Sequence, residues 1–584
     1  MIISKVHIQN YKNLSDVNIE FNRLVIFIGE NNSGKSNLLK AITLPFLHDE
    51  IGNLNKNLGW QDINNSAKAR YFEYIQENIE DIRKGSVDLQ SFIDVIPFVM
   101  VEVSFEPDGA DEYYVHKWVN SIDSEKPHYA IRYQFFIENP NELLVHIGKV
   151  LQDTDSIDNI KMNLLPIELY KYSIIIPSTG EQVAYSDLTN FKYNSLAAER
   201  DDFSNKNTQL GSKALVNLLQ NKLSEDQKVQ VERSYEKFFA DLKEISKIEG
   251  LFNWQDESDL ENAKDFFEEI TLLPNMPSMS SLLNNVRLGF GDEYLHTQGL
   301  GYRNLVYLFV MMNSLKVNSD IALNILTIEE PEAHLCISNE LLLTSFINSI
   351  VKSSNQVQLF ISTHSSVFLN KLELENVAVV SEGDAFSLKS EMETKQLNYL
   401  AKKPNLDFLK FLFSRRCILV EGPTEELFIK SYISSKNKSL NDIEVISLHK
   451  GFKKMLDIWL KVNKNSSHKL GIIRDFDNQQ KAKEEHEKYN SYQNICVATT
   501  VEYTLEPEIV KTGSNFEKLK SYFINNHGWD NVDTPDLLSD KWRGAKAETM
   551  LMFCSDLVID ELVDIELPQH INKVLKFLQS GEKE

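Results

Sequence analysis

The stretch LVIFIGENNSGKS, residues 24–36, decides which fold the rest of the chain is expected to adopt. It begins as an apolar strand, continues as a glycine-rich loop of the pattern GxxxxGK[ST], and leads into NLLKAITLPFL, which has helical periodicity. In this context the backbone N–H groups of the loop wrap phosphates, Lys35 neutralises phosphate charge and the Ser36 hydroxyl binds Mg²⁺. The residues expected to bind ATP and its Mg²⁺ are Gly29, Asn32, Gly34, Lys35, Ser36 and Asn37.

Three further features fit the same site. ILTIEEP is an apolar strand that ends in two carboxylates, and we expect Glu329 to hold the Mg²⁺ shell while Glu330 orients the attacking water. His364 follows the next apolar strand, where a histidine can contact the γ-phosphate. Gly299 precedes a helix, and glycines at a helix start expose N–H groups to an anion. Strands that alternate with helices indicate a largely parallel sheet with its site at the carboxyl ends of the strands.

A second group of carboxylates follows two later apolar strands, CILVEG and KLGIIRDFD. Glu421 ends the first strand, and Asp475 and Asp477 end the other. Oxygen ligands of this kind suit Mg²⁺ and Mn²⁺, and two such cations can clamp the attacking and leaving oxygens of a phosphodiester. Either motif alone can be an acidic turn, but their order and spacing together favour a metal site.

Composition excludes several classes of protein. The chain has 584 residues, enough for about two to four domains. We find no signal pattern and no apolar run of membrane-spanning length, so we expect a cytoplasmic protein with no membrane partner. Its four cysteines are too widely spaced for a zinc site or a disulfide framework, and Cys417 and Cys496 are expected in the core.

The net charge of -24 argues against a protein that coats nucleic acid, although it leaves room for a nuclease that concentrates carboxylates around cations. Local basic patches could still bind phosphates. The candidates are Arg415 with Arg416, Lys450 to Lys454, and Lys541 to Lys546. Each of them has an alternative interpretation as a solvated face.

The glycine-rich loop, the TQGLGYR segment, the acid pair and His364, in this order, resemble an ABC-type ATPase head of the RecF/SMC/Rad50 kind. The signature departs from the usual pattern because Thr297 or Gln298 stands where a serine is typical. The segments VEGPTEE, HKGFKK and RDFD look like a Toprim domain, and the combination resembles the OLD (overcoming lysogenization defect) family of nucleases. The expected fold class is therefore α/β, with an ABC-type head that has a helical insertion, followed by a Toprim α/β domain.

The resemblance divides the chain into five segments. These are residues 1–200 and 286–385 as the two parts of the ATPase, 201–285 as a helical insertion and candidate dimerisation region, 386–408 as a polar linker, and 409–584 as the Toprim nuclease domain. The resemblance also implies that two heads sandwich two ATP molecules. We therefore expect a homodimer or a higher homo-oligomer.

Residue roles follow from the same resemblance. Glu421 and Glu425 would be the Toprim glutamates, and Asp475 with Asp477 its D-x-D pair. Glu502 is the expected third metal-binding element, with Glu506 as the alternative. Lys546 matches a lysine near the scissile phosphate that would stabilise developing negative charge, although it could equally be an ordinary surface lysine.

The resemblance implies a DNA endonuclease that nicks DNA or cleaves both strands with two divalent metals, Mg²⁺ or Mn²⁺, under control of the ATPase head. Because the family includes Gabija nuclease subunits and retron-associated effectors, we expect a role in bacterial antiphage defence. A helicase, or a reverse transcriptase with its RNA–DNA product, would then be a partner. The alternative is a DNA-repair or structural ATPase whose Toprim domain binds DNA or a partner without cutting.

Overall fold

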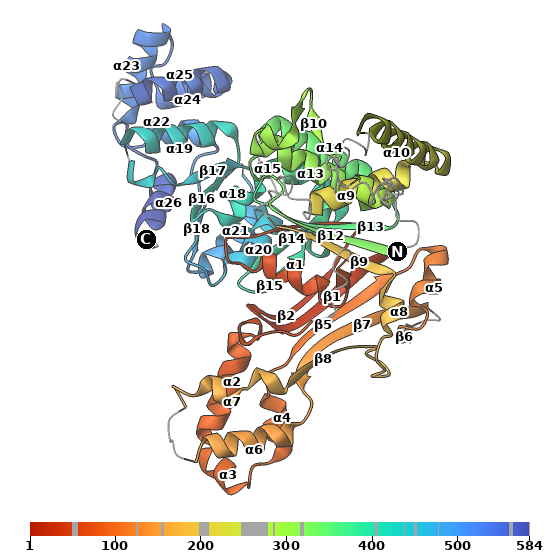
Figure 1. Cartoon of the computed structure of the whole chain (residues 1–584). Helices are drawn as coiled ribbons and strands as arrows, with labels where there is room; N and C mark the ends of the chain where they lie inside the picture. The colour runs from red at the N-terminus through yellow and green to blue at the C-terminus, as the bar shows by residue number, and fades with distance from the viewer. Residues whose placement is uncertain are drawn as a thin grey trace, which may run out of the picture.

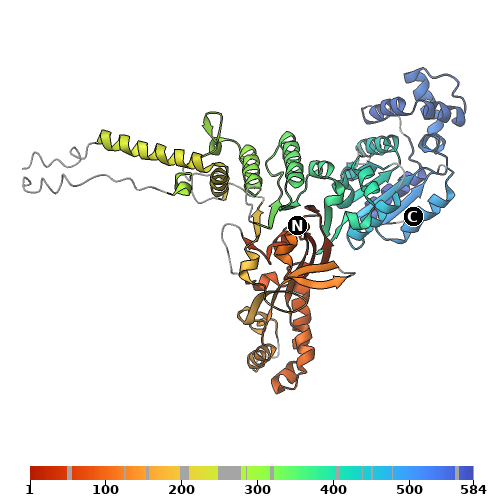
Figure 2. The same cartoon turned by 90° about the vertical axis from the view of Figure 1, so that its right-hand side faces the viewer.

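The structure is a computed structural model of the chain. It describes residues 1–48, 56–123, 126–152, 157–197, 210–246, 278–283, 286–315, 321–402, 407–436, 438–448, 452–476, 478–559 and 565–582. Figures 1 and 2 show a central body built on two sheets, a helical lobe that extends from one end of the body, and a C-terminal domain at its side. None of the helices in these ranges is long and apolar enough to span a membrane.

A seven-stranded sheet carries the glycine-rich loop. Its strands, in spatial order, are β15 (Asp384–Ser387), β14 (Val377–Ser381), β3 (Leu24–Ile28), β13 (Val357–Ser362), β12 (Leu323–Glu329), β9 (Phe191–Leu196) and β4 (Leu47–His48). All neighbours except β14 and β15 are parallel, which confirms the largely parallel sheet. Because β13 lies between β3 and β12, the strand that precedes His364 ends between the glycine-rich loop and the acid pair.

A second, antiparallel sheet packs against the first. It consists of β2 (Leu14–Glu20), β1 (Ile2–Tyr11), β5 (Val99–Glu106), β7 (Lys126–Ile137), β6 (Val119–Asp123) and β8 (Tyr170–Ile175). The fully buried amide of Gln358 in β13 donates to the carbonyls of Ile3 and Asn22, each at 2.9 Å, and accepts the N–H of Ile3 at 2.8 Å. This side chain therefore joins the two sheets.

The helices of the lobe are α2 (Asn65–Glu77), α3 (Ile79–Lys84), α4 (Leu89–Val95), α6 (Pro140–Val150) and α7 (Lys161–Leu164). They come from two separate stretches of the chain and cap the far ends of the antiparallel strands (Figure 1). Tyr71 fixes one such meeting, because its hydroxyl donates to the carbonyl of Leu164 at 2.7 Å.

The described part of the predicted insertion is helical. It comprises α9 (Leu210–Lys222), α10 (Glu225–Ser246) and α12 (Met279–Leu283), and residues 201–209, 247–277 and 284–285 lie outside the described residues. Helix α9 packs on α13 (Leu300–Leu315) of the ATPase, whereas α10 extends away from the body in Figure 2. Its apolar residues Phe238 and Ile245 are exposed. A dimerisation role for this region stays a prediction.

The C-terminal domain is built on a parallel sheet. Its strands, in spatial order, are β17 (Glu444–Ser447), β16 (Arg416–Val420), β18 (Lys469–Arg474) and β19 (Ile495–Thr499). The helices around it are α19 (Pro423–Lys436), α20 (Phe452–Asn463), α21 (Gln480–Glu487), α22 (Leu505–Lys511), α23 (Asn515–His527), α24 (Pro535–Gly544), α25 (Lys546–Ile559) and α26 (Gln569–Ser580). Gly471 lets α26 approach β18, since a Cβ there would lie 2.3 Å from Val574 Cγ1. Cys417 and Cys496 are buried, as predicted.

The described part of residues 386–408, which the sequence predicts to be a polar linker, is largely helical, and residues 403–406 lie outside the described residues. The segment forms α16 (Leu388–Glu391) and α17 (Thr394–Ala401), and α18 (Phe408–Phe413) begins at its end. Its apolar residues recur among the polar ones and are buried: Leu388, Met392, Leu397, Leu400 and Phe408. They belong to a single apolar core that contains Ile361 of the ATPase sheet and Trp459 of the C-terminal domain. The seven-stranded sheet of the ATPase and the sheet of the C-terminal domain are thus packed on one common core.

His570, at the start of α26, gives the fold a testable pH dependence. Burial lowers the pKa of His570 to about 4 from its ordinary 6.5, so the unfolded chain binds a proton at a higher pH than the folded chain. The contribution of neutral His570 to the free energy of unfolding is fully present above about pH 6.5 and is lost as the pH falls towards 4. We expect the wild-type protein to lose about 2 kcal/mol more unfolding free energy than His570→Phe between pH 7 and pH 5. Urea unfolding at both pH values measures this, and equal losses would contradict it.

Candidate nucleotide site and carboxylate site

Lys35 is held over the glycine-rich loop at the start of α1 (Lys35–Thr43). Its ammonium group donates to the carbonyls of Gly29 at 2.9 Å and Glu30 at 2.7 Å, and the residue is buried. Burial lowers the pKa of Lys35, while the charge of Glu330 is the largest influence that raises it. Gly34 has φ +117°, in the region that favours glycine, and a Cβ there would lie 2.8 Å from Asn13. The sequence therefore places a cation and the backbone N–H groups of a first helical turn at one helix start, as an anion site requires.

Ser36 and Glu329 meet across the site although they are far apart in the sequence. The Ser36 hydroxyl donates to the Glu329 carboxylate, so the first turn of α1 touches the end of β12. A hydroxyl and a carboxylate side by side are oxygen donors of the kind that Mg²⁺ takes beside nucleotide phosphates. The donor set fits the predicted metal in kind.

Glu330 and His364 lie within electrostatic reach of Lys35. Burial lowers the pKa of His364, the charge of Lys35 lowers it further, and the charge of Glu330 raises it. Glu330 has φ +44°, an uncommon backbone conformation for this residue, and its N–H donates to the carbonyl of Ser362 at 2.8 Å. The structure thus brings together the second acid, the histidine and the lysine that the sequence singled out.

Glu332 is a residue that the sequence interpretation missed. Its carboxylate accepts the backbone N–H of His364 at 2.7 Å and therefore fixes the loop that carries the histidine. Burial raises the pKa of Glu332. The signal was present as a third acid directly after the EEP motif.

Asn13 braces the glycine-rich loop from the turn between β1 and β2. Its amide donates to the carbonyl of Ser33 at 3.0 Å, and its oxygen accepts from Asn37 at 2.8 Å. The side-chain amide of Asn37, which the sequence predicts to bind the nucleotide, therefore donates to Asn13 and helps to hold the loop. Asn32 is exposed on the loop with φ +64°.

Gly299 is exposed just before α13, and its carbonyl accepts the N–H groups of Tyr302 and Arg303. Two residues on, Gly301 permits a close approach, because a Cβ there would lie 2.4 Å from the carbonyl oxygen of His334. The start of α13 is therefore packed on the loop that follows the acid pair. Contact between Gly299 and a nucleotide on a second head stays a prediction.

The carboxylates predicted for metal binding stand at neighbouring strand ends of the C-terminal sheet. The register of β16 and β18 pairs Leu419 with Ile472, and its continuation brings Glu421 beside Arg474. Arg474 Nε lies 3.8 Å from Glu421 Oε1. Asp475, the next residue in the chain after Arg474, is buried. Asp477 lies outside the described residues.

Glu425 lies in the first turn of α19, where a negative charge is favoured by the helix dipole. Its Oε2 would be 2.5 Å from a Cβ at position 422, so Gly422 makes room for it. Within the part of the chain that the structure describes, no three His, Cys, Asp or Glu side chains are gathered closely enough to hold a metal ion. The oxygen donors fit Mg²⁺ or Mn²⁺ in kind, and the complete ligand set stays a prediction.

The third metal-binding element has two candidates in different surroundings. Glu502 is half-exposed and lies 3.2 Å from Lys511, which also pairs with Asp536 at 2.9 Å. Glu506 is buried and accepts from the Thr504 hydroxyl at 2.9 Å. Lys546 begins α25, and its side chain lies outside what the structure describes.

Thr500 is a second residue that the sequence interpretation missed. Its buried hydroxyl accepts the N–H of Phe476 at 2.9 Å and donates to the carbonyl of Glu502 at 2.7 Å. Its own N–H donates to the carbonyl of Arg474 at 3.0 Å. Thr500 therefore fixes the backbone on both sides of Asp475 relative to the end of β19.

Replacing Thr500 with valine keeps the shape of the side chain and removes both hydroxyl contacts. Because residues that orient metal ligands typically cost about 10–100-fold in affinity or activity when lost, we expect Mn²⁺ to bind the nucleotide-free protein about 10-fold more weakly. Electron paramagnetic resonance titration of free Mn²⁺ measures the affinity. Thr500→Ser retains the hydroxyl and is expected to stay within about 2-fold of the wild-type protein. Equal affinities for the valine variant and the wild-type protein would contradict the assignment.

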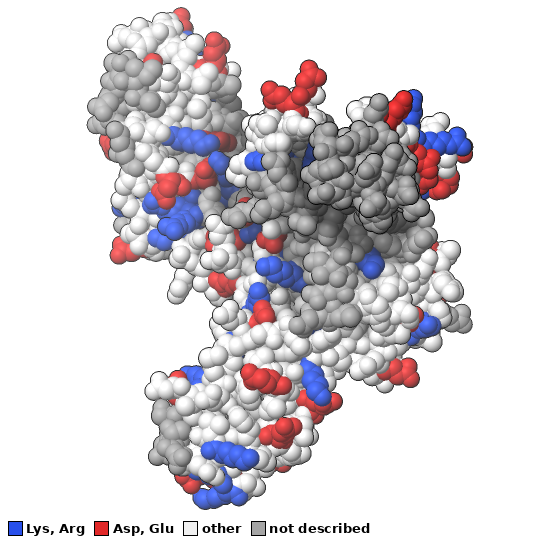
Figure 3. Space-filling model, in the orientation of Figure 1, with Lys and Arg blue, Asp and Glu red and all other residues white. Residues whose placement is uncertain are grey.

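Charges are mixed over the described residues of the face in Figure 3, where Lys and Arg are interspersed with Asp and Glu. Two of the candidate basic patches contain residues that are already paired with acids. Arg416 Nε lies 3.0 Å from Asp442, and Lys541 lies 2.9 Å from Asp530. A polyanion such as DNA would therefore be contacted by individual basic side chains and not by one continuous basic surface on this face.

Comparison with known proteins adds independent evidence. Residues 1–369 match a family model described as AAA ATPase domain, and residues 412–477 match one described as Overcoming lysogenization defect protein-like, TOPRIM domain. The chain is 24% identical over 495 residues to Endonuclease GajA of Bacillus cereus (strain HuB5-5), which covers 74% of this chain and 67% of that protein. It is 22% identical over 452 residues to Endonuclease GajA of Bacillus cereus (strain VD045), with 74% and 68% covered.

Two further similarities are weaker. The chain is 25% identical over 167 residues to DNA replication and repair protein RecF of Leptospira interrogans, which covers 25% of this chain and 46% of that protein. A crystal structure of the SmcHead bound to the C-winged helix domain of ScpA is 15% identical, with 67% of this chain and 100% of that chain covered. Its TM-score of 0.32 is too low to bear on the fold.

Proposed function

Because the chain belongs to the AAA ATPase domain family through residues 1–369 and carries an OLD-like TOPRIM domain, we propose that it is a metal-dependent DNA endonuclease controlled by its ATPase. The two GajA proteins that share 74% of its length are endonucleases by name, and this supports DNA as the substrate. The observation that carries the proposal is the placement of Glu421 and Asp475 at the adjacent ends of two parallel strands. Arg474, which precedes Asp475, lies 3.8 Å from Glu421.

Divalent Mg²⁺ or Mn²⁺ at the carboxylate site would supply charge to stabilise the attacking and leaving oxygens of the phosphodiester. Glu421, Glu425, Asp475 and Asp477 would hold two such ions, together with Glu502 or Glu506. Lys546 would stabilise negative charge on the scissile phosphate. Arg474 would keep Glu421 oriented from the buried side, since its Nε lies 3.8 Å from that carboxylate.

At the nucleotide site the residues would divide the work of ATP hydrolysis. Lys35 and the N–H groups of Gly29, Asn32 and Gly34 would bind the phosphates, and Ser36 with Glu329 would hold Mg²⁺. Glu330 would orient the attacking water, and His364 would contact the γ-phosphate. Gly299 of a second head would complete the site, which makes a homodimer or a higher homo-oligomer the working form.

The setting we propose is antiphage defence in the bacterial cytoplasm. Its support is the likeness to the OLD family and to the GajA proteins. A helicase, or a reverse transcriptase with its RNA–DNA product, would be the partner. Loss of plaque protection on deletion of the gene would test this setting separately from the enzymatic activity.

Incubation of supercoiled plasmid with the purified protein tests the enzymatic proposal. We expect conversion to open-circular or linear DNA with Mg²⁺ or Mn²⁺, none with a chelator, and a different rate when ATP is present. The partial likeness to RecF favours one alternative, a repair ATPase whose TOPRIM domain binds DNA without cutting. DNA binding without cleavage under every metal and nucleotide condition would favour that alternative.

A further inference from the structure

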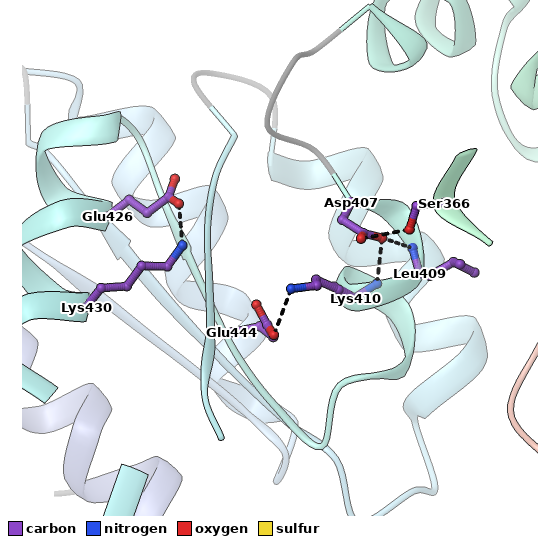
Figure 4. A network of polar contacts seen from close by, with 7 residues as sticks. All are labelled: Ser366, Asp407, Leu409, Lys410, Glu426, Lys430 and Glu444. Atoms are coloured by element: carbon purple, nitrogen blue, oxygen red, sulfur yellow. Dashed lines mark hydrogen bonds and ion pairs between the residues drawn. The ribbon is translucent and has the colours of Figure 1, made fainter. Parts of the chain in front are cut away.

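One contact joins the loop that carries His364 to the C-terminal domain. Ser366, the first residue of α15 (Ser366–Lys371), donates its hydroxyl to Asp407 Oδ2 at 2.8 Å. Asp407 is the N-cap of α18, because its Oδ1 accepts the N–H groups of Leu409 and Lys410, each at 3.1 Å. Figure 4 shows this carboxylate between the serine and the start of the helix. The start of α15, two residues after His364, is thus joined to the start of α18 by the Asp407 side chain.

Helix α18 leads directly into β16, whose far end carries Glu421. Its apolar face is buried in the core that both domains share, through Phe408, Phe411 and Leu412. On its other side Lys410 lies 3.1 Å from Glu444 at the start of β17, as Figure 4 shows. A displacement of α18 therefore reaches two strands of the C-terminal sheet.

The end of β17 contacts α19, the helix that carries the predicted metal ligand Glu425. The N–H of Ser447 donates to Glu426 Oε2 at 3.2 Å, and Glu426 also pairs with Lys430 at 2.6 Å (Figure 4). Glu426 follows Glu425 in the first turn of α19. The path from Ser366 thus ends beside a predicted metal ligand.

A second contact joins the glycine-rich loop itself to the C-terminal domain. Glu30 Oε1 lies 3.2 Å from His468 Nε2, and His468 is buried. The two residues border a cavity of about 160 Å³ that is also lined by Asn31, Asn32 and Asn463. His468 directly precedes β18, whose far end carries Asp475.

The first contact stands at the start of α18, the helix that leads into β16, and the second stands at the start of β18. Each of these strands ends at a predicted metal ligand. We propose that Ser366 and His468 are positioning residues through which the nucleotide state of the ATPase reaches Glu421 and Asp475. Strands of five and six residues span about 17–20 Å, and a packed strand moves as a unit. This inference rests on the proposed function and names the route by which the ATPase controls the carboxylate site.

The test compares the rate of plasmid nicking with and without a non-hydrolysable ATP analogue. The wild-type ratio is expected to differ from one by about 5-fold or more in either direction, the range of ordinary coupling between sites. Ser366→Ala and His468→Ala should each bring the ratio about 2- to 5-fold closer to one, within the worth of a single hydrogen bond. The double variant should bring it within about 2-fold of one. Nucleotide-free nicking and analogue binding should stay near wild-type values.

Two matched variants separate coupling from stability. Ser345→Ala removes a serine hydroxyl of α14 (Ile337–Ser353) that donates only to the carbonyl of Leu341 among the described residues, and it should leave the ratio unchanged. Ser366→Thr keeps a hydroxyl and should preserve the ratio. A double variant with the full wild-type response would overturn the route while the nuclease proposal stands. Wild-type nicking without any nucleotide response would also overturn it, whereas absence of wild-type nicking would overturn the proposed function.

Discussion

Asp475→Asn is expected to reduce metal-dependent nicking of plasmid DNA by about 10³-fold or more, equal to about 4 kcal/mol of transition-state stabilisation. Asparagine has the same shape as aspartate but lacks the charge that attracts a divalent cation. Asp475 is buried, so the melting temperature is measured beside the nicking rate to show that the variant is folded. The rate of conversion of supercoiled to open-circular DNA, measured across Mg²⁺ and Mn²⁺ concentrations, checks the result.

Asp533→Asn is the matched control, because its carboxylate is exposed in the same domain and pairs only with Lys520 among the ion pairs of the described residues. Its nicking rate should stay within about 2-fold of the wild-type value, as surface ion pairs are worth little. ATP binding should be intact in both variants. Nicking by Asp475→Asn at the control rate would show that the carboxylate site is not the catalytic centre.

Glu330→Gln is expected to slow ATP hydrolysis by about 10²–10⁴-fold while ATP still binds, since a positioned base contributes about that much. Lys35 and Ser36, which would hold the phosphates and Mg²⁺, are unchanged. Phosphate release measures the hydrolysis rate, and fluorescence of a labelled nucleotide measures binding.

Glu373→Gln provides a close control for this variant. Glu373 also has a positive φ, +66°, and it is exposed, so the same change of side chain occurs in a similar backbone conformation away from Lys35. Hydrolysis by this control should match the wild-type rate. If Glu330→Gln and Glu373→Gln hydrolyse ATP equally fast, Glu330 does not orient the water.

The sequence was sufficient where the chemistry depends on short segments. Lys35 and Ser36 follow from one loop between a strand and a helix, and Glu329 from the end of one apolar strand. Their meeting could be predicted because parallel strands present their carboxyl ends at one edge of a sheet. The family comparisons confirm both the ATPase and the TOPRIM assignments.

Supporting residues could not be predicted, because each acts through a contact between distant segments. Asn13 braces Ser33 from another turn, Glu332 holds the N–H of His364, and Thr500 accepts the N–H of Phe476. A polar residue that binds a backbone group has no periodic pattern of its own. The same limit applies over residues 386–408, where polar side chains hid the buried leucines between them.

The core that the ATPase sheet and the C-terminal domain share affects the stability of any fragment of the chain. Phe411 of α18 and Trp459 of α20 lie in the same apolar cluster as Ile361 of the ATPase sheet. A fragment that began at the TOPRIM domain would carry this apolar surface uncovered, at a cost of several kcal/mol for the aromatic side chains alone. Proteolysis between the ATPase and the C-terminal domain would therefore release a fragment that is less stable than the same residues are in the intact chain.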